Sequence, residues 1–70
     1  SSFDFFSIKK LFSYKSGRWD LELDSGILVK LPKNDIIESL EFLILFLDEN
    51  KEKKINKIDL RQKNQIILNG

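Results

Sequence analysis

The residues of this chain that could perform acid–base chemistry are carboxylates at strand spacing. Asp20 and Glu22 are separated by one residue, and so are Asp59 and Arg61. A carboxylate pair supports general acid–base catalysis only in a site that excludes water, and the chain has no histidine, no cysteine and no glycine-rich phosphate loop. Because these charges alternate with apolar residues, the pattern predicts a solvated sheet face, with Asp59 and Arg61 as a local ion pair. We therefore expect no enzyme and no cofactor.

The element that carries the first two carboxylates is predicted to be a β-hairpin over residues 18–32. Charged and apolar residues alternate through 18–24, and the apolar positions recur at the same spacing through 27–31. The loop Asp24-Ser25-Gly26 fits the three-residue turn that ends in a left-handed glycine. This turn pairs Asp20 with Lys30 on the wet face, and on the buried face it pairs Leu23 with Ile27, Leu21 with Val29 and Trp19 with Leu31.

A further strand is expected upstream of this hairpin. Phe12 and Tyr14 alternate with Leu11, Ser13 and Lys15, and Ser16-Gly17 can form a two-residue turn that places Tyr14 opposite Trp19. Together these strands make a three-strand meander over residues 9–31. Pro32 ends it, because proline has no backbone donor for a ladder.

The segment after Pro32 is predicted to be an amphipathic helix over residues 34–49. Asn34 or Asp35 can cap this helix, and Asp35 with Glu38 has the spacing of a capping box. Phe42 and Leu45 fall outside the apolar stripe. We therefore expect them to contact either residues of the protein that are missing from this sequence or a partner protein. The stripe itself comprises Ile36, Leu40, Leu43 and Leu47, flanked by Ile37, Ile44 and Phe46, and it should be buried against Trp19, Leu21, Val29 and Leu60.

The last part of the chain is predicted to be a second hairpin over residues 56–69. A two-residue turn at Lys63-Asn64 would place Ile67 inward, opposite Leu60, and leave Ile66 and Leu68 pointing outward. Apolar residues on the outer face of a last strand are unusual, since edge strands are normally blunted by charge or covered. The predicted fold is therefore α+β: an antiparallel sheet of about five strands, the meander plus the C-terminal hairpin, with one helix on one face and an open edge that could self-associate.

Length and charge narrow the classes of function. The chain has 70 residues, with 12 basic and 11 acidic side chains and a net charge of +1, so it lacks the electrostatic footprint of a nucleic-acid binder. A small sheet that stacks bases on Trp19 and Tyr14 is nevertheless the alternative function. The chain has no cysteine or histidine for a disulfide or a zinc site that would stabilise so small a fold, so we expect a fragment of a larger domain. The early aromatics Phe3, Phe5 and Phe6 either contact the missing part of that domain or pack into the core of this chain.

Three segments in this order resemble the distal part of the β domain of the FtsQ/DivIB cell-division proteins. They are Gly17-Arg-Trp-Asp-Leu-Glu-Leu-Asp-Ser-Gly-Ile-Leu-Val-Lys-Leu-Pro32, the leucine-rich helix, and Ile55-Asn-Lys-Ile-Asp-Leu-Arg61 with its final hairpin. Phe6-Ser-Ile-Lys-Lys10 sits at a matching spacing upstream. The resemblance implies that residues 1–70 lie in the periplasm, in a single-pass inner-membrane protein whose membrane helix and POTRA domain are absent from this chain. It also implies a divisome scaffold that binds FtsB and FtsL to assemble the septal cell-wall machinery.

In this family the last strand accepts a strand from the partner, which the resemblance transfers to the final hairpin. Where relatives carry an aromatic and a glycine, this chain has Gln62 and Asn64-Gln65, so Ile66 and Leu68 are expected to replace an apolar socket. For the basic residues before the tryptophan, a solvated turn is an equal alternative to a role in binding. The implied partner-binding residues are Lys15, Arg18, Gln62, Lys63, Asn64, Gln65, Ile66, Ile67 and Leu68.

Overall fold

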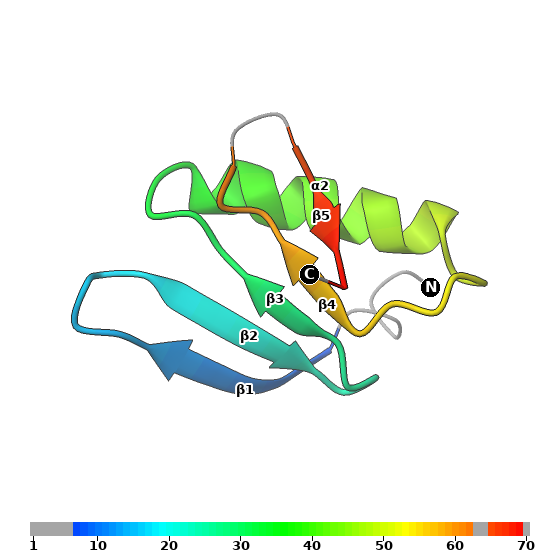
Figure 1. Cartoon of the computed structure of the whole chain (residues 1–70), viewed down its shortest axis with the longest axis horizontal. Coiled ribbons are helices and arrows are strands. Elements are labelled where there is room, and N and C mark those ends of the chain that lie inside the picture. The colour runs from blue at the N-terminus through cyan, green and yellow to red at the C-terminus, as the bar shows by residue number, and fades with distance from the viewer. Residues whose placement is uncertain (1–6, 63–64, 70) are drawn as a thin grey trace.

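A computed structural model of the chain describes residues 7–62 and 65–69, which form a five-stranded sheet with a helix across one face (Figure 1). The strands lie in the order β1-β2-β3-β4-β5. The elements are β1 (Ile8–Ser13), β2 (Trp19–Leu23), β3 (Leu28–Lys30), α2 (Ile36–Glu49), β4 (Lys57–Asp59) and β5 (Ile67–Leu68). The predicted α+β fold and its number of strands are confirmed.

The sheet is mixed, which corrects the expectation of a wholly antiparallel one. β3 and β4 are parallel, whereas the other neighbouring pairs are antiparallel. The reason is the helix between them. Because α2 carries the chain back along the sheet, β4 starts at the same end as β3, as parallel neighbours joined by a crossover must.

The hairpin of β2 and β3 has the predicted register. Asp20 pairs with Lys30 and Leu21 with Val29. Gly26 adopts a left-handed φ of 93°, and the Leu23 N–H donates to the Ile27 carbonyl at 2.9 Å to close the turn. Local turn chemistry therefore sets the alignment of these two strands.

The first turn is longer than predicted. Ser13, not Tyr14, lies opposite Trp19. The Tyr14 N–H donates to the Arg18 carbonyl at 3.0 Å, and the Gly17 N–H donates to the Tyr14 carbonyl at 2.9 Å. With φ of 89°, Gly17 takes the same left-handed place as the glycine of the second turn, so three residues close this hairpin too.

The core lies between α2 and the inner strands. A row of paired residues, Leu21, Val29 and Ile58, runs across β2, β3 and β4 and is buried against Leu43 and Leu47 of the helix. Leu60 is also buried, as expected. The full set of buried apolar residues is Leu21, Leu23, Val29, Leu31, Leu43, Leu47, Ile58 and Leu60.

Several residues expected in this core lie at its margin. Trp19 is 37% exposed, and Ile36 and Leu40 are only partly buried. Ile37, expected beside the stripe, is 70% exposed. The cause is the position of α2, which lies far from β1 in Figure 1, and all six residues of β1 are exposed. Alternation identifies the face of a strand, but it does not say how much of that face the helix covers.

The helix ends at Glu49 as predicted, but it begins at Ile36 rather than at residue 34, and the predicted cap does not form. Asp35 occupies the N-cap position with a left-handed φ of 59° and makes no side-chain cap hydrogen bond, so the capping box is wrong. An N-cap side chain normally acts from extended backbone, which Asp35 lacks. Phe42 and Leu45 lie outside the core stripe as predicted, with 48% and 62% of their surfaces exposed.

Within residues 7–62 and 65–69, no helix combines the length and the apolar character needed to cross a membrane. The early aromatics Phe3, Phe5 and Phe6 lie outside the described residues.

Candidate functional site

The side chains of the last strand point to the opposite faces of the sheet from those predicted. Leu68 pairs with Ile58, and Ile67 pairs with Asp59. Ile66 and Leu68 therefore pack against the core, whereas Ile67 is 41% exposed on the other face of the sheet. The connection between β4 and β5 is longer than the assumed two-residue turn, and a shift of register by one residue turns every side chain of a strand to the other face.

β5 is the edge strand at one end of the sheet, and its backbone has an outward-facing side. The Asn69 N–H donates to the Lys57 carbonyl of β4 at 2.8 Å. Because alternate residues of an antiparallel strand bond to the same neighbour, the N–H and C=O of Leu68 point away from β4. No strand covers that side among the residues that the structure describes, so β5 offers main-chain groups to an added strand.

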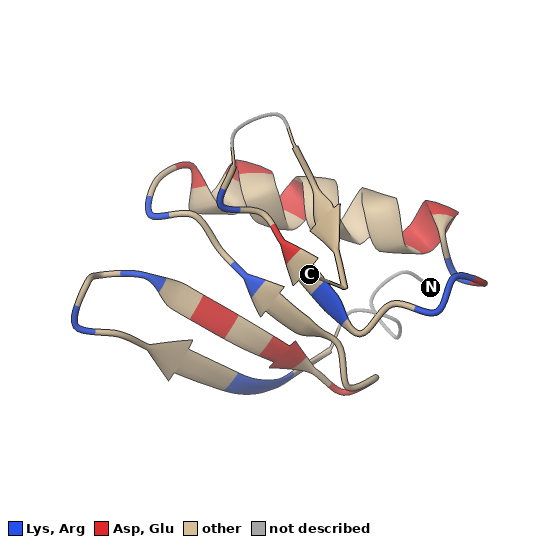
Figure 2. Cartoon of the chain, viewed as in Figure 1, with Lys and Arg blue, Asp and Glu red and all other residues tan. Residues whose placement is uncertain are grey.

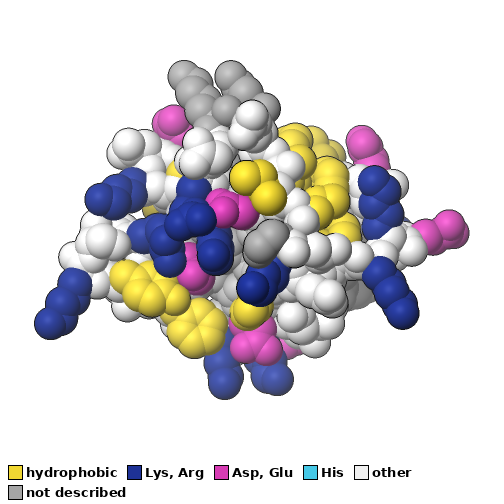
Figure 3. Space-filling model, viewed as in Figure 1, with side chains coloured by type: hydrophobic (Ala, Val, Ile, Leu, Met, Phe, Trp, Pro, Cys, Tyr) yellow, Lys and Arg dark blue, Asp and Glu magenta, His cyan; other side chains and the backbone are white. Residues whose placement is uncertain are grey.

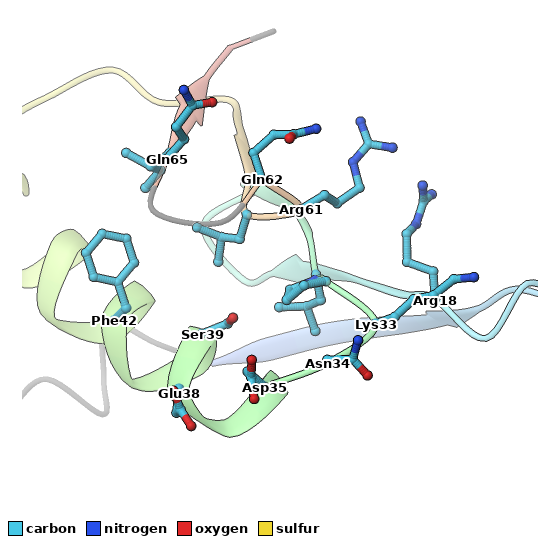
Figure 4. A pocket seen from close by; sticks show the side chains of 14 residues that line it. Arg18, Lys33, Asn34, Asp35, Glu38, Ser39, Phe42, Arg61, Gln62 and Gln65 are labelled. Carbon is cyan, nitrogen blue, oxygen red and sulfur yellow. The ribbon is translucent and has the colours of Figure 1, made fainter.

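A groove of about 840 Å³ opens between the first turns of α2 and the chain that joins β4 to β5 (Figure 4). It is lined by apolar side chains from Leu31, Pro32, Leu60 and Ile66, and by Phe42, which points from the helix toward the segment carrying Gln65. The other residues of the lining are polar or charged: Arg18, Lys33, Asn34, Asp35, Glu38, Ser39, Arg61, Gln62 and Gln65.

This groove unites several of the residues implied by the family resemblance. Gln62, Gln65 and Ile66, from the connection between β4 and β5, line it together with Arg18, which lies far away in the sequence. Lys15 lies exposed near the β1–β2 turn and is not part of the lining. Ile67 and Leu68 form β5, while Lys63 and Asn64 lie outside the described residues.

The sequence reasoning missed the helix side of the groove. Phe42, Glu38 and Ser39 contribute there, and Arg61 lies at the end of β4. A signal for Phe42 was present, because it lies off the core stripe of a very apolar helix. No pattern in the sequence indicated that this side of the helix would face the last connection.

Two arginines at the groove are held by neighbouring carboxylates. Arg61 Nη2 lies 2.7 Å from Asp59 Oδ2, and its Nε and backbone N–H both donate to Asp59 Oδ1 at 3.0 Å. Arg18 Nε lies 3.2 Å from Asp20 Oδ1, and its guanidinium stacks 4.9 Å from the centre of the Tyr14 ring. The predicted pair of Asp59 and Arg61 is confirmed, and Figure 4 shows both arginines extending in the same direction.

The hydrogen bonds from Arg61 change the acidity of Asp59. They stabilise the charged carboxylate and lower its pKa, which outweighs the opposite effect of partial burial. The same contact raises the pKa of Arg61, although an arginine carries its positive charge at physiological pH even without such a contact. A fixed cation consequently stands beside the groove at any physiological pH.

The carboxylates form a ladder of alternating charge on the open face of the sheet. One row of paired residues runs across the strands as Phe12, Asp20, Lys30, Asp59 and Ile67. Figure 2 shows the acidic and basic positions alternating across β2, β3 and β4, and Figure 3 shows basic side chains gathered over the same face with hydrophobic side chains beside them. Asp20 and Asp59 therefore each lie opposite Lys30 of the central strand β3.

Comparison with known proteins gives the family of the chain. A family model described as "Cell division protein FtsQ/DivIB, C-terminal" matches residues 2–61. The chain belongs to the FtsQ/DivIB family. The match includes β1 to β4 and α2 and ends at Arg61, before β5. The open edge of β5 therefore follows from the structure of the sheet and not from the family match.

A curated relative agrees with this assignment. The chain is 38% identical over 61 residues to the cell division protein FtsQ of Rhizobium meliloti (strain 1021). The aligned part covers 83% of this chain and 20% of that protein, so the chain spans about a fifth of the length of the relative. The resemblance read from the tryptophan, glycine and Ile-Asp-Leu-Arg segments is thereby confirmed.

Proposed function

We propose that residues 1–70 are the distal part of the periplasmic β domain of a divisome scaffold and that this part binds FtsB, in a complex with FtsL, by strand addition to β5. The scaffold is anchored by a single inner-membrane helix outside this chain and helps to assemble the septal cell-wall machinery. The role is binding rather than catalysis. Membership of a cell-division family supports the setting, and the sheet edge supports the mode of binding.

The observation that carries the proposal is the free side of β5. The N–H and C=O of Leu68 point away from β4, and the strand has no neighbour on that side within the described chain. In strand addition, main-chain hydrogen bonds supply affinity and alternate side chains supply selectivity. Ile67, exposed on the open face, is the side chain of β5 best placed to contact the incoming strand.

The groove beside β5 supplies the remaining contacts. Ile66 and Phe42 offer apolar surface, and Gln62 and Gln65 offer amide donors and acceptors. Arg18 adds a positive charge at the margin, where charge acts mainly on the rate of association. Lys63 and Asn64 lie outside the described residues and enter the proposal only through the family resemblance, and Lys15 contributes only long-range charge.

The same edge could pair two copies of the chain, and the open face could bind nucleic acid. Phe12 and Tyr14 are exposed, which stacking on bases requires. However, Asp20, Glu22 and Asp59 lie among the basic side chains of that face and offset part of their attraction for phosphates. Sedimentation at increasing protein concentration and a salt-dependent oligonucleotide gel shift distinguish these alternatives from peptide binding.

The test is calorimetric titration of the full-length protein with a synthetic peptide covering the extended segment of FtsB from the same organism. We expect saturable binding with one peptide per protein, and no heat from a peptide of the same composition in scrambled order. Equal binding of both peptides, or binding of neither, contradicts the proposal.

A further inference from the structure

Asn69, directly after β5, bonds to the start of β4 through both its backbone and its side chain. Its Oδ1 accepts hydrogen bonds from the backbone N–H of Asn56 at 2.6 Å and of Lys57 at 3.2 Å. Its Nδ2 donates to the Lys54 carbonyl at 3.3 Å, and its own N–H donates to the Lys57 carbonyl at 2.8 Å. One residue therefore clasps the end of the edge strand to residues 54–57.

The segment that Asn69 holds is itself tied to the middle of the sheet. The Asn56 carbonyl accepts a hydrogen bond from the Leu28 N–H of β3 at 3.0 Å. The peptide units of Asn56 thus join the side chain of Asn69 on one side and β3 on the other. The clasp is anchored in the sheet rather than in a free loop.

β5 needs such an anchor because it has little else to hold it. It has two residues and one neighbouring strand, with two pairs in the ladder. Isolated two-stranded pairing of this length is marginal in water. Asn69 also takes a left-handed φ of 56°, a conformation that asparagine tolerates better than most residues, and this turns its side chain back toward residues 54–57.

We infer that Asn69 is a positioning residue that holds β5 in the conformation to which a partner strand adds. This inference rests on the proposed function. All four hydrogen bonds of Asn69 are directed to Lys54, Asn56 and Lys57, so the free side of Leu68 is left open. When only a fraction of the protein molecules has β5 in the binding-competent conformation, the apparent affinity for the partner is reduced by that fraction. By increasing this fraction, Asn69 raises the affinity without itself contacting the partner.

The test uses two substitutions of Asn69 and one matched control in the full-length protein. Asn69→Gly keeps the left-handed backbone accessible and removes the side-chain clasp. Asn69→Asp keeps the oxygen that accepts from Asn56 and Lys57. The control is Asn50→Gly, because Asn50 also donates from Nδ2 to a carbonyl, that of Phe46 at 2.7 Å, but at the end of α2 away from β5.

Two readouts separate positioning from general stability: affinity for the FtsB peptide, and hydrogen exchange of the amides in residues 65–69 compared with those of β2. We expect Asn69→Gly to weaken binding about tenfold and to speed exchange in residues 65–69 only, with Asn69→Asp much closer to the wild type. Asn50→Gly should leave peptide affinity and β5 exchange unchanged.

Each other outcome overturns the inference in a recognisable way. Wild-type affinity in Asn69→Gly shows that the clasp does not position the strand, while the proposed function stands. If Asn69→Gly speeds exchange in β2 as well as in β5, and its affinity falls only as much as the fraction of folded protein does, Asn69 has a general structural role instead. No binding by the wild type removes the proposed function and with it any positioning role.

Discussion

Replacing Ile67 by threonine tests the contact that β5 makes with an incoming strand. Fully burying an isoleucine side chain stabilises by about 1.5–3 kcal/mol. Ile67 leaves 41% of its surface exposed, so covering the remainder contributes at most about 0.6–1.2 kcal/mol. Threonine keeps the β-branch that favours strands while removing most of this apolar surface. We expect Ile67→Thr to weaken FtsB-peptide binding about three- to eightfold.

The assay is calorimetric titration of the full-length protein, with circular dichroism and a denaturation curve for each variant. The matched control is Ile37→Thr, because Ile37 is 70% exposed on α2 and does not line the groove. Both variants should retain the wild-type spectrum, and only Ile67→Thr should bind more weakly. Equal affinities for Ile67→Thr and the wild type would refute the contact assigned to this side chain. Substitution of Ile66 or Leu68 is a poorer probe, because both pack against the core.

Three further predictions concern the core and the charges. Leu43 is fully buried, so Leu43→Ala should cost about 2–5 kcal/mol of unfolding free energy, and an unshifted chemical denaturation midpoint would contradict the core assignment. Arg18→Glu should weaken peptide binding at low salt, by less than Ile67→Thr does, and Lys15→Glu should weaken it less still. A loss of affinity that does not depend on salt concentration would refute a role of these charges at the rim. Arg61 lowers the pKa of Asp59, so the stability from this pair is present above the ordinary carboxyl pKa and is lost as pH falls through the lowered pKa. Asp59→Asn should therefore reduce the acid sensitivity of unfolding, and an unchanged pH profile would count against the pair.

The parts of the fold that sequence reasoning predicted are those set by local chemistry. Alternation and the turn at Gly26 gave the register of β2 and β3, and helical periodicity gave the extent of α2. The parallel pairing of β3 and β4 was missed because it depends on where a crossover helix returns the chain. The exposure of Trp19 was missed because it depends on how far α2 extends over the sheet.

The candidate site, like the fold, was predicted only where it depends on local sequence. The family resemblance indicated the segments, and Arg18 and Gln65 both line one groove. The predicted orientation of Ile67 was wrong because local residue preferences do not determine the length of the connection between β4 and β5. That length sets the register of β5. Phe42 and the clasp at Asn69 join segments that no local pattern relates.

Strand addition to β5 is tested most directly by amide hydrogen exchange at Leu68, measured by NMR with and without the FtsB peptide. In the free protein the Leu68 N–H points away from β4 and should exchange quickly, whereas the Asn69 N–H is bonded to the Lys57 carbonyl at 2.8 Å and should already be protected. On binding, the Leu68 amide should become protected as the added strand accepts its hydrogen bond. Saturating peptide that leaves the exchange of Leu68 unchanged would show that the partner does not add to this edge.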